Sequence, residues 1–211
     1  MIAGARLRIA GALVLAATGV SSRQLLAQDA RLAARLDKPT FSAVNAIVDS
    51  ARVARIPTAP LVDKALEGAA KGSDGPKIIV AVHQLSLRMA SAKRVLGPSA
   101  SADEIKAAAG AIDAGVSARD LARLRDVSGK RPITMPLAVL TDLIGREVPV
   151  ATATNVVLQL ARSGVKDPEF ALFQRNVRAD IDRGAEPSAA ATTRARGLVA
   201  AKSAPPAKPA E

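Results

Sequence analysis

Cysteine, tryptophan and tyrosine are absent from this chain of 211 residues, and histidine occurs once, as His83. Without cysteine, the chain can form no disulfide, no thiolate metal site and no thiol nucleophile. A single histidine also excludes a metal site built from several histidines. Only three residues are aromatic, so the chain has almost no rings on which nucleobases or sugars could stack. These absences exclude several classes of catalytic and ligand-binding site, so the functions that remain for the chain are mostly non-catalytic.

Alanine dominates the apolar residues. Hydrophobic residues make up 49% of the chain, and 46 residues are alanine. Alanine brings only a methyl group to a core, so the core must be thin and its elements must approach closely. Alanine also has the highest helix propensity. The length is typical of one domain, including a domain assembled from repeats.

Basic residues outnumber acidic residues in the chain. The chain has 30 basic and 19 acidic residues, a net charge of +11. This balance is typical of proteins that bind nucleic acid, phospholipid headgroups or an acidic polymer. A compositionally biased genome produces the same balance without any anionic partner, and the sequence leaves both interpretations open.

The N-terminus has the pattern of a secretory signal peptide. Two arginines within the first eight residues precede residues 9–22, which carry no charge. This stretch is shorter than the roughly 18 to 20 apolar residues that span a bilayer, and it suits the apolar region of a signal peptide. The preferred cleavage site follows Ala27, with a site near Ser22 as the alternative. We therefore predict a signal peptide over 1–27; an uncleaved anchor or a buried helix is the remaining interpretation.

Export would place the protein outside the cytoplasm and would restrict the kinds of partner that it can meet. Cleavage after Ala27 leaves 27 basic and 19 acidic residues, so the mature protein stays basic. We predict a periplasmic or extracellular protein with no transmembrane span after cleavage. An exported protein meets little nucleic acid, so the expected partner is an unknown protein or an anionic component of the envelope.

The rest of the chain shows helical periodicity. Apolar residues recur at spacings of three and four, as over 42–54, and alternation typical of strands is scarce. Ser101 and Glu104 have the spacing of a capping box, in which each side chain bonds to the other residue's backbone. Residues 28–198 are therefore predicted to form an all-α domain. Residues 199–211, rich in alanine, proline and lysine, are predicted to form a disordered tail.

A recurrence organises the predicted helices. Residues 55–89 align with 147–181 without a gap, and residues 115–146 repeat the pattern more faintly. The recurrence predicts antiparallel helical hairpins that stack into a compact bundle or a short solenoid-like array; chance agreement between similarly capped helices is the alternative. The identities at predicted helix boundaries are Pro57 with Pro149, Gly72 with Gly164, and Pro76 with Pro168. The predicted hairpins are 55–97, 115–146 and 147–184.

The usual catalytic arrangements find no support. His83 has no acid or nucleophile beside it in sequence, so we interpret it as an ordinary residue of a helix. Asp63 and Glu67 lie among lysines, which is typical of a solvated helix face. No Asp-rich loop with the spacing of a calcium site occurs. We predict a protein that is not an enzyme and has no catalytic, cofactor-binding or metal-binding residues. An enzyme with an unrecognised site is kept as an alternative.

Basic residues cluster in one part of the sequence, at Arg119, Arg123, Arg125, Lys130 and Arg131. The cluster could hold phosphate or carboxylate groups, because arginine presents a planar fork of donors; a solvated face is the alternative. Exposed charges contribute little to folding, so reversing Arg119, Arg123 and Arg131 to glutamate is expected to leave the helices intact.

The predicted function is a structural or protein-interaction role in the envelope or periplasm. The alternative is a basic module that binds anionic envelope polymers or a membrane surface.

Overall fold

The computed structural model describes residues 30–203. The predicted signal peptide over 1–27 lies outside these residues. Between 30 and 203 the chain forms helices joined by short loops and contains no strand, which confirms the all-α prediction. The helices are α2 (Lys38–Val53), α3 (Ala59–Ala70), α4 (Gly75–Leu96), α5 (Ala102–Asp113), α6 (Ala118–Ser128), α7 (Thr134–Gly145), α8 (Val150–Arg162), α9 (Asp167–Asp182) and α10 (Pro187–Ser203).

Helix α2 begins four residues earlier than the stripe over 42–54 indicated. Asp37 caps it: the side chain accepts a hydrogen bond of 2.8 Å from the Thr40 N–H. Pro39 therefore lies in the first turn of α2, where a proline loses no hydrogen bond because the first N–H groups have no partner within the helix. The sequence alone suggests that Pro39 ends a short segment before residue 42, but in the structure Pro39 belongs to the start of α2.

Equivalent positions of the recurrence have the same backbone conformation. Gly72 and Gly164 each lie two residues past a helix end, with φ of 66° and 70°. The non-glycine residues Arg55 and Glu147 also share the left-handed region, with φ of 55° and 67°. Left-handed backbone closes a helix by turning the next residue back toward the preceding turn. The recurrence in sequence is therefore also a recurrence of helix endings.

A buried aliphatic residue follows each of the two left-handed non-glycine positions, Arg55 and Glu147. Ile56 donates its N–H to the Ala51 carbonyl at 2.8 Å, and Val148 donates to the Leu143 carbonyl at 3.1 Å. Both side chains are buried in the core. Each helix thus ends on a hydrogen bond and an apolar contact at the same point, as in the Schellman ending.

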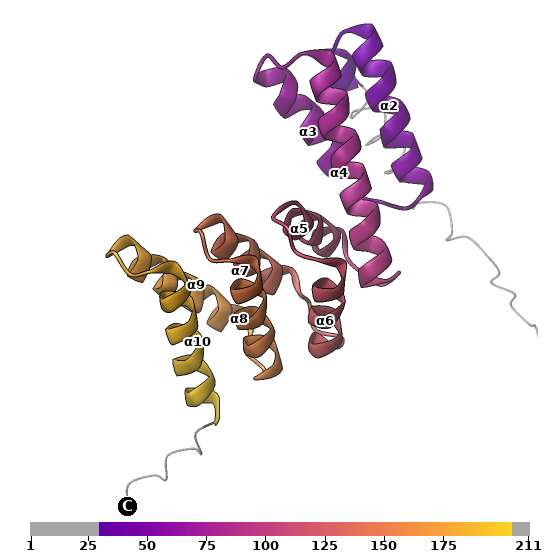
Figure 1. Cartoon of the computed structure of the whole chain (residues 1–211). Helices are drawn as coiled ribbons and strands as arrows, with labels where there is room; N and C mark the ends of the chain where they lie inside the picture. The colour runs from indigo at the N-terminus through magenta and orange to yellow at the C-terminus, as the bar shows by residue number, and fades with distance from the viewer. Residues whose placement is uncertain (1–29, 204–211) are drawn as a thin grey trace, which may run out of the picture.

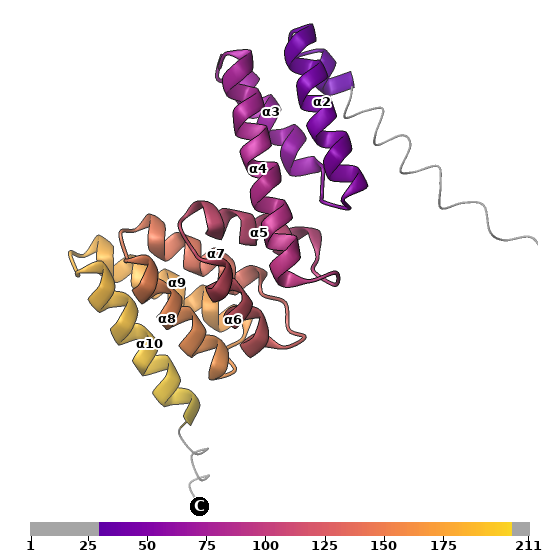
Figure 2. The ribbon, with the colours of Figure 1, turned by 45° about the vertical axis from the view of Figure 1, so that its right-hand side comes forward.

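The helices stack in two rows. Helices α2, α4, α6, α8 and α10 follow one another in the first row, and α5, α7 and α9 follow one another in the second. Figure 1 shows the rows seen along one direction and Figure 2 shows them after a turn of 45°. Between the rows, the neighbours that pack most extensively are α4 with α5, α7 with α8, and α9 with α10. The predicted hairpins contain α3–α4, α6–α7 and α8–α9, so the packed pairs in the second half begin one helix away from the predicted units. The division into three hairpins stays a prediction.

Alanine fills the contacts between helices. Ala108, Ala109 and Ala111 of α5 are buried, as are Ala191 and Ala195 of α10. Small side chains let helix axes approach closely, and the larger core residues then occupy the spaces between the rows. The largest fully buried side chain is Phe170.

Helix α10 continues to Ser203, beyond the predicted start of the tail at 199. Val199 is half-buried against the core, and Lys202 forms an ion pair of 2.8 Å with Glu169 of α9. These contacts hold the last turn, so the prediction of disorder is wrong for 199–203. Residues 204–211 lie outside the described residues.

Helix α4 joins two regions of different build. Helices α2, α3 and α4, here called the N-terminal bundle, pack together at one end of the molecule (Figure 1). Helices α5 to α10, here called the C-terminal array, continue the two rows. Helix α4 has 22 residues and packs against both regions, through α2 and α3 on one hand and α5 and α6 on the other.

Candidate functional site

The five residues of the predicted anionic patch do not gather at one place. Arg119 lies in the first turn of α6, whereas Lys130 and Arg131 follow the end of that helix. Eleven residues of helix separate these ends by about 16 Å. The structure brings Arg125, Lys130 and Arg131 to the same end of α6 and leaves Arg119 at the other.

Three of the five are already bonded within the protein. Arg123 pairs with Asp120 at 3.1 Å. Arg125 pairs with Glu104 at 3.0 Å and donates to the Gly129 carbonyl at 2.6 Å. Arg131 donates to the Ala161 carbonyl of α8 at 2.9 Å. Reversal of Arg131 would therefore break a bond to α8, and reversal of Arg125 would break its pair with Glu104. That reversal of Arg119, Arg123 and Arg131 leaves the helices intact stays a prediction.

Glu104 is the buried centre of this end of the array. Its carboxylate accepts from the Ser101 N–H at 2.9 Å, which completes the predicted capping box, and from the Ile133 N–H at 3.1 Å. It also pairs with Arg125. Burial by itself raises the pKa of the Glu104 carboxyl, but the two N–H donors and the Arg125 guanidinium outweigh burial and lower its pKa. Glu104 is therefore an ionised structural group that joins α5, α6 and α7.

A hollow of about 620 Å³ lies beside Glu104. Lys130 and Asp126 both line it and carry opposite charges. Because Glu104 and Arg125 in the same lining neutralise each other, the hollow has no excess of positive charge to hold an anion. The predicted patch consequently reduces to Lys130, with Arg119 exposed elsewhere.

The other titratable residues singled out from the sequence are surface groups. His83 is exposed on α4. Glu67 pairs with Lys71 and with Lys64, the latter at 3.1 Å, and the hydrogen bond from Lys71 is the main reason why the pKa of Glu67 is lowered. Across residues 30–203, no three acidic or histidine side chains gather in a way that could hold a metal ion. Within the same residues, no helix combines the length and apolarity that a membrane span requires.

Ser163 and Lys166 have the spacing of a serine–lysine catalytic pair, although the sequence was expected to contain no catalytic arrangement. In enzymes with that pair, one helical turn carries both side chains. Here both residues lie in the loop between α8 and α9, and the Ser163 hydroxyl donates to the Gln159 carbonyl at 3.0 Å. The hydroxyl is thus engaged as a helix-end bond.

A groove between α9 and α10 is the better candidate for a binding site. The groove has a volume of about 490 Å³ and lies at the end of the array. Its floor is apolar: Phe173 is buried, and Leu172 is 49% exposed. Gly197 of α10 leaves open space above the floor, because a methyl group there would meet no atom within 4 Å. The remaining lining residues are Glu169, Asn176, Asp180, Thr193, Arg194 and Leu198.

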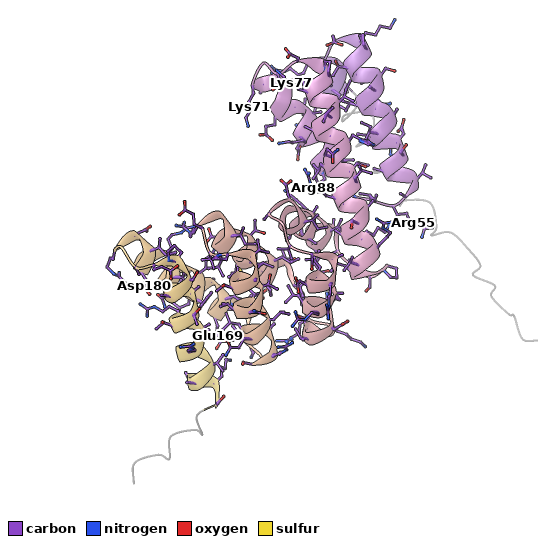
Figure 3. The ribbon with its side chains drawn as sticks, in the orientation of Figure 1. Arg55, Lys71, Lys77, Arg88, Glu169 and Asp180 are labelled. Carbon is purple, nitrogen blue, oxygen red and sulfur yellow. The ribbon has the colours of Figure 1, made fainter. Side chains whose placement is uncertain are left out.

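Ion pairs bridge α9 and α10 at both ends of the groove. At one end Arg194 holds Asp180 through bonds of 2.6 Å and 2.8 Å, and at the other Lys202 holds Glu169 at 2.8 Å. Figure 3 labels the two acidic residues, both at the end of the molecule far from the N-terminal bundle. Hydrogen bonds from Arg194 and Lys202 are the main causes that lower the pKa values of Asp180 and Glu169. Both carboxyls are therefore ionised at neutral pH, where they can orient a ligand and have no proton to give.

Comparison of the chain with protein-family models, with curated proteins and with solved structures gave no match. The candidate site therefore rests on its own geometry. Its residues carried little signal in the sequence, because Asn176, Thr193 and Gly197 belong to no motif and become neighbours only when α10 packs on α9.

Proposed function

We propose that this protein is an interaction scaffold and that the groove between α9 and α10 holds an amphipathic helix of a partner protein. The observation that carries the proposal is the place of the groove in the stacking of the two rows. Helix α8 lies between α6 and α10, whereas among the helices of residues 30–203 α10 packs extensively against α8 and α9 alone. The groove thus lies where the next helix of the row would stack, so a helix is the shape that fits it.

The dimensions of the groove favour the same occupant. Its lining on α9 extends from Glu169 to Asp180, about 16 Å of helix or three turns. A helix that docks in a groove uses apolar residues spaced by three, four and seven, and three turns accommodate that set. Leu172, Phe173 and Leu198 supply the apolar contact. The charged pairs at the two ends can orient polar residues that flank such a stripe.

We place the scaffold in the cell envelope or periplasm. The support is the N-terminal pattern of two arginines followed by residues 9–22 without a charge. Mass spectrometry of the native protein should find an N-terminus between Val20 and Ala30 in the envelope fraction. Recovery of intact Met1 in the cytosol would contradict the assignment.

The groove can be tested by photo-cross-linking in the native cell. A photoreactive amino acid in place of Leu172 reports on the groove, and the same amino acid in place of the exposed Ala151 on α8 is the matched control. We expect a discrete protein adduct from position 172 and none from position 151. Equal labelling from both positions would contradict a specific site.

A second variant separates docking from simple proximity. Gly197→Phe fills the groove, and Gly110→Phe fills open space on α5, where a methyl group likewise meets nothing within 4 Å. We expect Gly197→Phe to abolish the adduct and Gly110→Phe to retain it, with helical circular dichroism unchanged in both. An adduct with twice the mass of the chain would identify a second copy as the occupant and overturn the partner-protein proposal.

A further inference from the structure

The face of α4 that points away from the core has an unusual composition. Lys77, Val80, His83, Leu87 and Arg94 are all exposed, and their spacings of three, three, four and seven place them on one side of the helix. The opposite side carries buried residues, including Val82 and Met89. We call these five residues the outer face of α4. With 22 residues, the helix presents a ridge about 33 Å long.

The outer face combines exposed apolar side chains with basic ones. Val80 is 59% exposed and Leu87 is 51% exposed. Of the four large hydrophobic side chains that are exposed between residues 30 and 203, three belong to the N-terminal bundle: Val53, Val80 and Leu87. Apolar exposure is therefore concentrated in one region of the molecule.

Positive charge is concentrated in the same region. Residues 30–97 contain 11 basic and 5 acidic residues, whereas residues 98–203 contain 15 and 12. Helix α4 itself contains no acidic residue. Arg94 forms no ion pair with any described residue, and Lys77 pairs only with the exposed Asp74 at 2.9 Å. The cations of the outer face are consequently available to an outside partner.

The end of α2 extends this basic surface. Lys93 of α4 donates to the Ala54 and Arg55 carbonyls, at 2.7 Å each, which fixes the end of α2 against the end of α4. Arg55 and Val53, the latter 87% exposed, thus lie at the same end of the bundle as Arg94. Figure 3 shows Arg55 at the end of the bundle opposite to Lys71 and Lys77.

We propose that the outer face of α4 docks the protein on an anionic lipid surface, with Val80 and Leu87 inserted among the acyl chains and Arg94 at the phosphates. Helices that lie in a membrane interface have this composition, with apolar residues on the membrane side and lysine or arginine around them. Basic residues near a negatively charged membrane add to the binding. The proposal concerns a different surface from the groove between α9 and α10 and does not depend on it.

A lipid surface fits better than a soluble acidic polymer. The outer face lies along a single helix and its side chains are exposed, so it can lie along a plane. An acidic polymer would use Arg94 and Lys77 and would leave Val80 and Leu87 without a role. Insertion of the two apolar side chains is therefore the property that separates a lipid surface from such a polymer.

Sedimentation with vesicles tests the binding. The full chain should pellet with vesicles of equal parts phosphatidylglycerol and phosphatidylcholine in 150 mM salt, and much less with phosphatidylcholine alone. Arg94→Glu should weaken the partition at least about fivefold, because one basic group near an anionic surface contributes about that factor. The double variant V80S/L87S should weaken it about tenfold or more, because the inserted apolar groups are lost.

Matched controls lie in the C-terminal array. Arg162→Glu changes an exposed arginine in the last turn of α8, as Arg94→Glu does in α4. Leu172→Ser removes a leucine as exposed as Leu87. Both controls should bind vesicles as the unmodified chain does. Equal losses in the controls and the α4 variants, or no binding of the unmodified chain to anionic vesicles, would overturn the proposal.

The absence of cysteine allows a direct measurement of insertion. Leu87→Cys and Leu172→Cys each create a single thiol that can carry an environment-sensitive dye. We expect a blue shift on addition of anionic vesicles for the dye at position 87 and none for the dye at position 172. Binding without a blue shift at position 87 would show attachment by charge alone, as to an acidic polymer, and would overturn the insertion of α4.

Discussion

Within the N-terminal bundle every ion pair joins residues three or four apart, whereas in the C-terminal array most ion pairs join one helix to another. The local pairs of the bundle are exposed, as between Lys64 and Glu67. In the array, Arg178 pairs with Asp142 across α9 and α7 at 3.0 Å, and Arg194 pairs with Asp180 across α10 and α9. The two regions therefore use charged side chains for different purposes.

The difference has an energetic basis. Exposed pairs along one helix contribute a few tenths of a kcal/mol, because both side chains stay solvated and lose conformational freedom when they pair. A pair between helices also fixes how the helices pack, and it contributes more when it is buried and hydrogen-bonded. In the array, ion pairs between helices stabilise the stacking of the helices. In the bundle, several basic residues stay exposed on the surface without a partner on another helix of the described chain.

Removal of the Glu104 carboxylate should have the largest effect on this contrast. Glu104→Ala leaves the buried N–H of Ile133 without an acceptor and Arg125 without its acid. We expect a loss of about 2 to 3 kcal/mol in the free energy of unfolding. Chemical denaturation followed by circular dichroism measures it. A loss below about 0.5 kcal/mol would contradict the role of Glu104 as the centre of the array.

The same carboxylate gives the array an acid dependence. The pKa of Glu104 is lowered in the folded protein. Its stabilising contribution is therefore fully present above the ordinary pKa of glutamate and is lost as the pH falls through the lowered value. Between those values the unmodified chain should lose stability as acid is added, and Glu104→Ala should lose less over the same range.

Substitution of the left-handed glycines tests whether equivalent positions of the recurrence contribute equally to the free energy of unfolding. Gly72→Ala in the bundle and Gly164→Ala in the array place a side chain at φ of 66° and 70°. Each should lower the free energy of unfolding by about 1 to 2 kcal/mol, because left-handed backbone disfavours residues with a Cβ. Open space surrounds both positions, so packing adds nothing. Losses that differ by more than about 1 kcal/mol would show that the two helix ends are not equivalent.

Arg131 and Lys130 form a neighbouring pair with different roles. Arg131→Ala removes the bond to the Ala161 carbonyl and should cost about 1 kcal/mol. Lys130 is exposed and forms no ion pair in the described part of the chain, so Lys130→Ala should leave the unfolding transition where it is. Thermal unfolding of the two variants side by side distinguishes them. Equal midpoints of thermal unfolding for the two variants would show that the hydrogen bond from Arg131 to α8 does not contribute to stability.

The smallest effect is expected for the local pairs of the bundle. Glu67 forms ion pairs with both Lys64 and Lys71 and is exposed. Glu67→Gln should leave the midpoint of thermal unfolding unchanged, because solvent screens both pairs. A clear fall of the midpoint would show that the bundle, like the array, depends on its ion pairs.

Local signals in the sequence were sufficient for much of the fold. The capping box of Ser101 and Glu104 and the closing glycines Gly72 and Gly164 act through bonds to nearby residues, so their effect can be read from spacing alone. The start of α2 was misplaced because a proline suits both the end of one segment and the first turn of the next. The side chain of Asp37, which decides between them, needed the structure.

The candidate sites could not be predicted in the same way. The predicted patch treated neighbouring arginines as one surface, but Arg131 reaches Ala161, thirty residues away in sequence. The groove residues Asn176 and Thr193 also come from separate helices. The outer face of α4 is different, because a helix of 22 residues without an acid is visible in the sequence. The sequence alone could not show which side of α4 is covered by other helices and which side is exposed.

Helix α4 also has a mechanical consequence. It contains no glycine or proline after Pro76, and its hydrogen-bonded backbone runs without interruption from its contacts with α2 and α3 to its contacts with α5 and α6. A continuous helix resists bending far more than a linker does, since kinks in helices arise mainly at proline, glycine and inserted groups. A force that acts on the bundle is therefore transmitted along α4 to α5 and α6. We therefore expect the groove between α9 and α10 to keep a constant distance and orientation relative to a surface that the bundle contacts.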